Sequence, residues 1–113
     1  MDILKKLVSV PGASGCEREI AKVIENEIKN YADEVYTDAL GNLIAHKKGS
    51  GKKIMFAAHM DEIGVAVTFI DDNGFLRFSN VGGLYTKELS ARRVIFKNGV
   101  TGVIYTEKDN KMM

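Results

Sequence analysis

The residues best suited to chemistry are a histidine and an aspartate two positions apart, in the stretch KKIMFAAHMDEIG at residues 52–64. An apolar run stops at His59, and Asp61 follows almost at once. If the chain stays extended there, both side chains point the same way, because side chains alternate along a strand. A neutral imidazole nitrogen binds Zn²⁺ or Co²⁺, and a nearby carboxylate orients the ring or raises its basicity. The pattern therefore predicts a metal ligand, although an ordinary surface turn fits the same three residues.

A complete metal site needs more donors than this pair, since a catalytic zinc takes about three protein ligands plus a water. Glu62 would face away from Asp61 on an ideal strand and is the weaker candidate. His46 follows a strand-like run beside two lysines, and we expect it to be solvated. Cys16 is the only cysteine, which excludes an intrachain disulfide and a thiolate zinc cluster.

Composition places the chain among globular proteins and excludes several classes of partner. It has 113 residues, of which 45% are hydrophobic and 27% charged, with a formal net charge of +1. That balance gives no electrostatic reason to expect nucleic acid or an anionic membrane as partner. The N-terminus is a poor signal peptide, and the apolar runs are too short to span a bilayer. With a single cysteine, we expect a cytoplasmic protein in a reducing compartment.

Two helices are predicted at the N-terminal end. Residues 2–10 carry apolar side chains at helical spacing, and Pro11 with Gly12 ends that segment. Ser14 and Glu17 then form an S-x-x-E pattern, which predicts a capping box at the start of a second helix. Its apolar stripe consists of Ile20, Val23, Ile24 and Ile28.

From residue 34 onward the hydrophobic period changes to that of strands. In residues 53–58, KIMFAA, a lysine is followed by a continuous apolar run, which predicts a strand buried on both faces. Asn-Gly pairs at 73–74 and 98–99 predict two hairpin turns. The predicted strands are 34–37, 42–47, 53–58, 63–70, 75–79, 92–96 and 100–107.

The order of elements, two helices followed by strands, favours an α/β layer running into a β-rich part. We place the boundary near Ile70, with residues 1–70 forming the α/β part and residues 71–113 the start of a small barrel or sandwich. Each half is short and would be poorly stable alone. This organisation predicts that the chain is incomplete or relies on a partner.

Four stretches together resemble the N-terminal third of the dinuclear-metal aminopeptidases, which include glutamyl aminopeptidase and the tetrahedral aminopeptidases. Members of this family are often labelled cellulase or endoglucanase. The matching stretches are VPGASGCEREI, DEVYTDALGNLIAHKKG, KIMFAAHMDEIGVAVTFIDDNGFLRFSNVGG and RRVIFKNGVTGVI. One departure is LSARRV at residues 89–94, where relatives usually carry Gly-Gln before Arg-Val.

The resemblance implies roles for the two candidate residues. It makes His59 a metal ligand and Asp61 the catalytic-site acid that orients it, while the bridging aspartate, the general-base glutamate and the other ligands lie further along in family members. The complete enzyme would hold two divalent ions, Zn or Co, and would release N-terminal residues from peptides. It would also form a homo-oligomer through an inserted β-barrel dimerisation domain, whose start matches residues 71–113.

The leading expectation is therefore an N-terminal fragment of a metalloaminopeptidase whose site is incomplete, so that the isolated chain is inactive. An alternative of another class is a non-catalytic module that self-associates through its β-rich half and retains a vestigial metal site. Endoglucanase activity would follow only from the family's labels, and the pair of carboxylates it requires cannot be assessed from Asp61 and Glu62 in the sequence.

Overall fold

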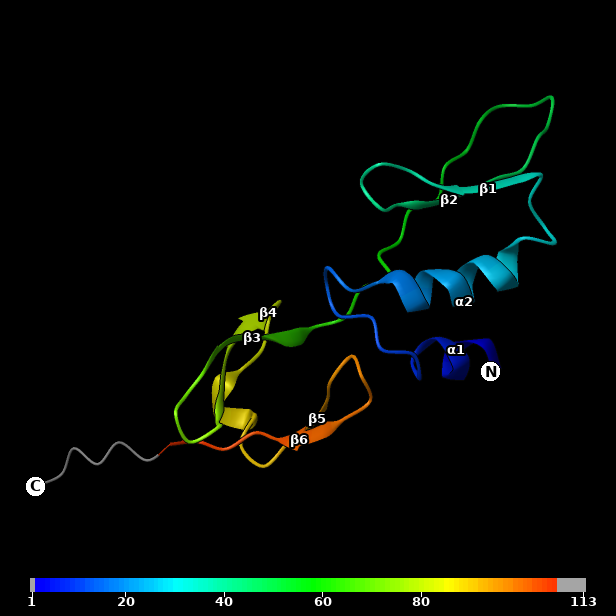
Figure 1. Ribbon diagram of the computed structural model, residues 1–113. Helices are drawn as coiled ribbons and strands as arrows, with labels where there is room; N and C mark the ends of the chain where they lie inside the picture. Colours follow the sequence, from blue (N-terminus) through cyan, green and yellow to red (C-terminus); the bar gives the residue numbers. More distant parts are fainter. Residues whose placement is uncertain (1, 108–113) are drawn as a thin grey trace, which may run out of the picture. The chain divides into compact units, whose positions relative to one another are not determined.

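The computed structural model describes residues 2–107, and the chain divides into two compact units, Met1–Gly82 and Gly83–Met113. The first unit contains α1 (Asp2–Leu7), α2 (Arg18–Ile28), β1 (Glu34–Thr37), β2 (Leu43–His46), β3 (Gly64–Ile70) and β4 (Leu76–Val81) (Figure 1). The second unit contains the 3-10 turn η1 (Thr86–Glu88), β5 (Arg93–Ile95) and β6 (Thr101–Val103). No helix within residues 2–107 is long and apolar enough to cross a membrane.

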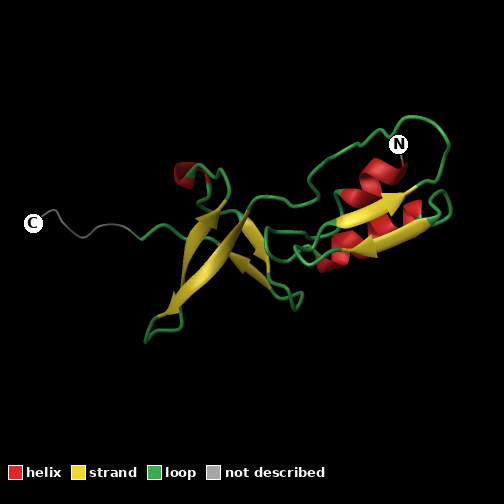
Figure 2. Ribbon diagram, turned by 90° about the horizontal axis from the view of Figure 1, so that it is seen from above, coloured by secondary structure: helices red, strands yellow, loops and turns green. Residues whose placement is uncertain are grey.

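Helix α2 provides the core of the first unit. Ile20 is only 4% exposed, and it packs against the loop that connects the two helices. A Cβ added at Gly12 would lie 2.8 Å from Ile20 Cγ2, so the close approach of the loop requires glycine there. The helices lie beside the β1–β2 hairpin (Figure 2), and β2 is in contact with α2.

The capping box predicted at Ser14 and Glu17 is wrong. Helix α2 begins at Arg18 with Glu17 as its N-cap residue, and no side chain caps it. The Ser14 hydroxyl instead donates to Asp61 Oδ2 at 2.5 Å, and Glu17 Oε1 accepts from the Gly15 amide at 2.6 Å. Because Glu17 is the N-cap residue, Ser14 lies in the loop before the helix and is not in the position from which a side chain caps it.

Three hairpins account for all six strands of residues 2–107. The pairs β1–β2, β3–β4 and β5–β6 are each antiparallel and form three separate two-stranded sheets. Both Asn-Gly turns fall where the sequence predicts them, with Gly74 at φ 84° and Gly99 at φ 83°. In the first of these turns, Asp71 Oδ1 accepts from the amides of Asn73 and Phe75 at 3.0 and 2.9 Å. The hairpin predictions are therefore confirmed.

The strand predicted over residues 53–58 is absent. This segment has no regular structure, and the side chains of Ile54, Met55 and Phe56 are 79%, 88% and 94% exposed. A strand buried on both faces needs a neighbour at each edge and a covering layer on each face. Among residues 2–107, each strand pairs only with the other strand of its own hairpin, and none pairs with this segment.

The sequence predicts a domain boundary near Ile70, whereas the two compact units divide between Gly82 and Gly83. Strands β3 and β4 lie on either side of Ile70 and pair with each other, so both belong to the first compact unit. The helices and strands of this unit agree with the α/β expectation. The division into residues 1–70 and 71–113, and the β-barrel, stay predictions.

The departure noted at LSARRV contains the only non-glycine residue with positive φ within residues 2–107. Ala91 has φ 64°, and its amide donates to Ile104 O at 2.9 Å. A left-handed conformation costs a residue with a Cβ about 1–2 kcal/mol, and glycine loses about 0.5–1 kcal/mol more chain entropy on folding than alanine. Replacing Ala91 by glycine therefore removes strain at a smaller entropic cost.

We predict that Ala91→Gly stabilises the second unit by about 0.5–1 kcal/mol. Urea unfolding followed through the NMR amide signal of Ile104, which donates to Arg92 O, measures the change. The matched control is Ala45→Gly in strand β2, which should instead destabilise its hairpin by about 0.5–1 kcal/mol. Destabilisation by Ala91→Gly would contradict the prediction.

Candidate metal centre

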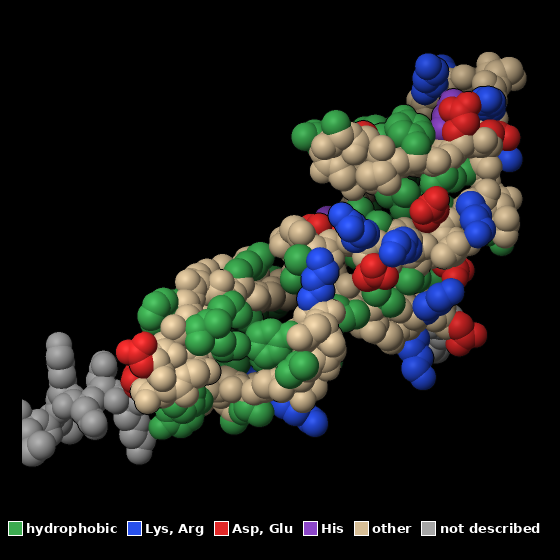
Figure 3. Space-filling view, in the orientation of Figure 1, with side chains coloured by type: hydrophobic (Ala, Val, Ile, Leu, Met, Phe, Trp, Pro, Cys, Tyr) green, Lys and Arg blue, Asp and Glu red, His purple; other side chains and the backbone are tan. Residues whose placement is uncertain are grey.

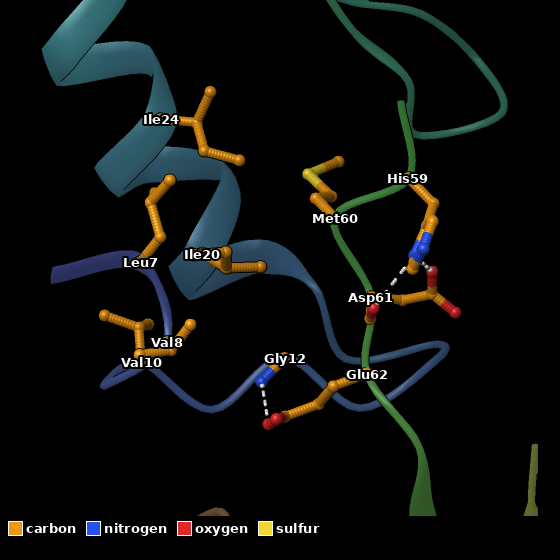
Figure 4. Close-up of a pocket in the computed structure, with 10 residues that line it drawn as sticks. All are labelled: Leu7, Val8, Val10, Gly12, Ile20, Ile24, His59, Met60, Asp61 and Glu62. Atoms are coloured by element: carbon orange, nitrogen blue, oxygen red, sulfur yellow. Dashed lines mark hydrogen bonds and ion pairs between the residues drawn. The ribbon is translucent and has the colours of Figure 1, made fainter. Parts of the chain in front are cut away.

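The segment that carries the candidate residues is held in place by Glu62. Its amide donates to Gly12 O at 2.8 Å, and its carbonyl accepts from the Ser14 amide at 3.3 Å, which forms an isolated parallel bridge with Ala13. Its carboxylate also accepts from the Gly12 amide at 3.0 Å. Glu62 therefore fastens the segment before β3 to the loop between the helices, and its side chain is turned away from that of Asp61 (Figure 4).

His59 and Asp61 lie together on the opposite side of the same segment (Figure 4). The imidazole Nδ1 is 3.0 Å from Asp61 Oδ1 and 3.1 Å from the Asp61 carbonyl oxygen. Both of these oxygens are acceptors, so the proton of a neutral ring is placed on Nδ1. The lone pair is then on Nε2, and the side chain is 86% exposed. A ring held in this way presents one nitrogen suited to a metal ion.

Ser14 completes this arrangement, and sequence reasoning missed it. Its hydroxyl donates to Asp61 Oδ2, while Oδ1 of the same carboxylate faces the imidazole. The pKa of Asp61 is lowered from its ordinary value, first by the Ser14 hydrogen bond and second by that of His59. Both partners stabilise the ionised carboxylate, which keeps it an acceptor for the imidazole N–H.

This lowered pKa predicts how the arrangement depends on pH. A carboxylate whose pKa is lowered by folding contributes to the free energy of folding at pH values above its ordinary pKa. This contribution is lost as the pH falls through the lowered pKa. Carboxyl ¹³C NMR should therefore give Asp61 a titration midpoint below about 3.9, the ordinary value. In Ser14→Ala the midpoint should rise, because the largest cause of the shift is removed. A wild-type midpoint at or above the ordinary value would contradict the arrangement.

The described residues supply one candidate metal ligand and not a complete site. Within residues 2–107, no three side chains of histidine, cysteine, aspartate or glutamate converge on one point. The second histidine, His46, lies on strand β2 with its Nδ1 3.6 Å from Glu34 Oε2. Cys16 is exposed and unpaired. A divalent ion at His59 therefore needs donors beyond those that the described chain brings together.

An apolar pocket adjoins the pair. It has a volume of about 250 Å³ and is lined by Leu7, Val8, Val10, Gly12, Ile20, Ile24, His59, Met60, Asp61 and Glu62. Figure 4 shows Met60 on the side facing α2, opposite His59. Successive side chains thus point alternately toward α2 and toward the side of the segment that carries the imidazole, as expected for an extended chain.

Comparison with known proteins identifies the family of this chain. The M42 glutamyl aminopeptidase family matches residues 41–112. A putative aminopeptidase of Acetivibrio thermocellus is 60% identical over 107 residues, which are 95% of this chain and 32% of that protein. The lysyl aminopeptidase of Pyrococcus furiosus is 43% identical over 110 residues, 91% of this chain and 32% of that protein. The chain therefore spans about a third of the length of these relatives.

Solved structures agree with this result. The TET aminopeptidase of a marine-sediment Thaumarchaeota archaeon superposes with a TM-score of 0.87 at 33% identity, covering 100% of this chain and 33% of its own. The TET1 peptidase of Pyrococcus horikoshii, which assembles into a tetrahedron or a large octahedral shell, gives a TM-score of 0.80 at 40% identity and covers 97% and 36%. With the sequence matches, these likenesses confirm the resemblance seen in the sequence: the chain belongs to the M42 glutamyl aminopeptidase family.

Proposed function

We propose that this chain provides the first metal ligand, His59, and its orienting carboxylate, Asp61, to an aminopeptidase that releases N-terminal residues from peptides by two-metal hydrolysis. The observation that carries the proposal is the hydrogen-bonded pair itself, found in a chain of the M42 family. Asp61 holds the proton on Nδ1 and thereby leaves Nε2 for the ion. Two divalent ions, zinc or cobalt, would supply Lewis acidity to the complete site when bound.

The other residues of the site position this pair. Ser14 keeps the Asp61 carboxylate ionised, as its effect on the pKa of that group indicates. Glu62 fastens the segment to the loop at Gly12, so that the imidazole is fixed relative to α2. We infer that Ser14 and Glu62 are positioning residues, since their polar groups face Asp61 and the loop backbone rather than the free imidazole nitrogen.

The proposal extends to substrates, assembly and location. We propose peptide substrates, a homo-oligomeric enzyme and a cytoplasmic location, with residues 71–113 as the start of a dimerisation domain. The assembly of the Pyrococcus horikoshii relative supports the oligomer. The exposed and unpaired Cys16 is consistent with a reducing compartment.

We predict that the 113-residue chain alone has no aminopeptidase activity, because one ligand does not hold two ions. Hydrolysis of leucine p-nitroanilide with added Co²⁺ or Zn²⁺ measures this, and the rate should equal that of the metal ion without protein. The same assay on His59→Ala is the control. Robust turnover by the wild-type chain that disappears in His59→Ala would show that the chain completes its own site, and the inactivity prediction would be wrong.

A further inference from the structure

Each of the two histidines of the chain faces a carboxylate, but the two pairs differ in how closely they approach. Histidine side chains reach the surface beside acidic side chains (Figure 3). His46 Nδ1 lies 3.6 Å from Glu34 Oε2, which is too long for a hydrogen bond. His59 Nδ1 lies 3.0 Å from Asp61 Oδ1. The orientation of the Asp61 carboxylate therefore distinguishes the second ring from the first.

The carboxylate of Asp61 is held through both of its oxygens. Oδ2 accepts from the Ser14 hydroxyl at 2.5 Å, while Oδ1 faces the imidazole of His59. Turning the carboxylate out of its present plane would weaken both contacts at once. The Ser14 hydroxyl therefore stabilises the rotation of the carboxylate in which one oxygen points at Nδ1.

The backbone of the loop places Ser14 beside Asp61. The Ser14 amide donates to Glu62 O at 3.3 Å, and Ala13 forms the parallel bridge with Glu62. The Cys16 amide donates to Ala13 O at 2.7 Å, which closes a turn around residues 14 and 15. None of these hydrogen bonds involves the Ser14 hydroxyl. Removing the hydroxyl should therefore leave the loop in place and change only the contact with Asp61.

We propose that Ser14 selects the nitrogen of His59 that is left for a metal ion. Either nitrogen of a neutral imidazole can carry the proton, and the hydrogen bond that the ring makes decides which one does. By holding Asp61 Oδ1 toward Nδ1, the Ser14 hydroxyl keeps the proton on Nδ1 and leaves the lone pair on Nε2. This role rests on the proposed function of His59 as a ligand, and it belongs to the hydroxyl rather than to the backbone of Ser14.

A second acceptor near the ring limits how large the effect can be. The Asp61 carbonyl oxygen lies 3.1 Å from Nδ1 of His59, and it stays in place when the Ser14 hydroxyl is removed. The carboxylate is the stronger acceptor of the two because it is charged. Loss of the hydroxyl should therefore weaken the preference for a proton on Nδ1 without abolishing it.

The ¹⁵N NMR signals of the imidazole nitrogens test the proposal in the 113-residue chain without added metal. They distinguish a protonated nitrogen from one that carries a lone pair, and at about pH 8.5 an ordinary imidazole is neutral. We expect His59 of the wild-type chain to carry its proton mainly on Nδ1. In Ser14→Ala the ratio of the Nδ1–H form to the Nε2–H form should fall about three- to tenfold, which is the effect of one hydrogen bond.

Matched variants separate the hydroxyl from the fold. Ser14→Thr retains a hydroxyl at the same position and should keep the wild-type ratio of the two forms. Ser9→Ala removes a hydroxyl that donates to Lys5 O at 2.6 Å, away from the candidate site, and should leave the ratio unchanged. The signals of His46 serve as an internal reference in the same spectra and should be the same in all variants.

Added Zn²⁺ tests the consequence for the ligand atom. In the wild-type chain it should shift the Nε2 signal of His59 and not the Nδ1 signal. A wild-type proton on Nε2, a Zn²⁺-dependent shift at Nδ1, or equal ratios in the wild type and Ser14→Ala would each overturn the proposal. Because the ratio is measured without metal, a complete enzyme that lacks peptidase activity would contradict the proposed function alone.

Discussion

His59→Ala should abolish the peptidase activity of a chimaera in which this chain replaces the matching 107 residues of the Acetivibrio thermocellus relative, to which it is 60% identical. In this chimaera, the relative provides the rest of the protein, which this chain does not span. Loss of a metal ligand removes the ion together with its chemistry. Asp61→Asn keeps the shape of the side chain but weakens the hold on the imidazole, so we expect a loss of about 10–100-fold. The effect of His59→Ala should therefore be the larger of the two.

Two measurements separate a ligand from a merely structural residue. The metal content of the purified chimaera should fall in His59→Ala, while its far-UV circular dichroism stays that of the parent. His46→Ala is the matched control, because His46 lies on strand β2 beside Glu34 and outside the candidate site. It should leave both metal content and kcat unchanged. An inactive but folded parent chimaera, or a fully active His59→Ala variant, would contradict the proposed function.

The elements that the sequence predicted correctly are those fixed by neighbouring residues. Each Asn-Gly turn requires glycine at positive φ, and Asp71 binds the backbone two and four residues ahead of it. The β1–β2 hairpin is similar, since Asp38 Oδ1 accepts from the amides of Leu40 and Asn42 within its own turn. Interactions over so short a distance in the sequence depend little on the rest of the chain.

The errors came from contacts between distant residues. Ser14 resembles a helix cap because Glu17 follows at the right spacing, but its hydroxyl is bound by Asp61, which is 47 positions away. No pattern within the loop carries that information. The resemblance includes VPGASGCEREI, but it assigned no role to Ser14.

The segment at residues 53–58 shows a second limit of sequence reasoning. Its apolar run was interpreted as a buried strand, and the composition is indeed that of one. Burial, however, is a property of the neighbours as well as of the segment. The same segment leads directly to His59 and Asp61. The proximity of these two side chains was predicted correctly. It follows from the alternation of side chains along an extended chain, which does not require a neighbouring strand.

The largest effect on stability should come from Ile20→Ala. Ile20 is the most buried side chain of the first unit, at 4% exposure, and the loop at Gly12 packs directly on it. Removing three buried carbons from such a position costs about 2–4 kcal/mol, from the lost burial and from the cavity that remains. Since the first unit contains few buried side chains, this is a large share of its stability. Urea unfolding followed by far-UV circular dichroism measures the loss.

The matched control is Ile3→Ala, the same deletion at a position on α1 that is 53% exposed, where we expect a change within about 0.5 kcal/mol. Amide hydrogen exchange at Glu62 then connects the core to the candidate site, because this amide donates to Gly12 O. If Ile20 supports the loop, exchange at Glu62 should accelerate in Ile20→Ala and not in Ile3→Ala. Unchanged exchange in both variants would mean that the loop holds His59 and Asp61 in place independently of the core.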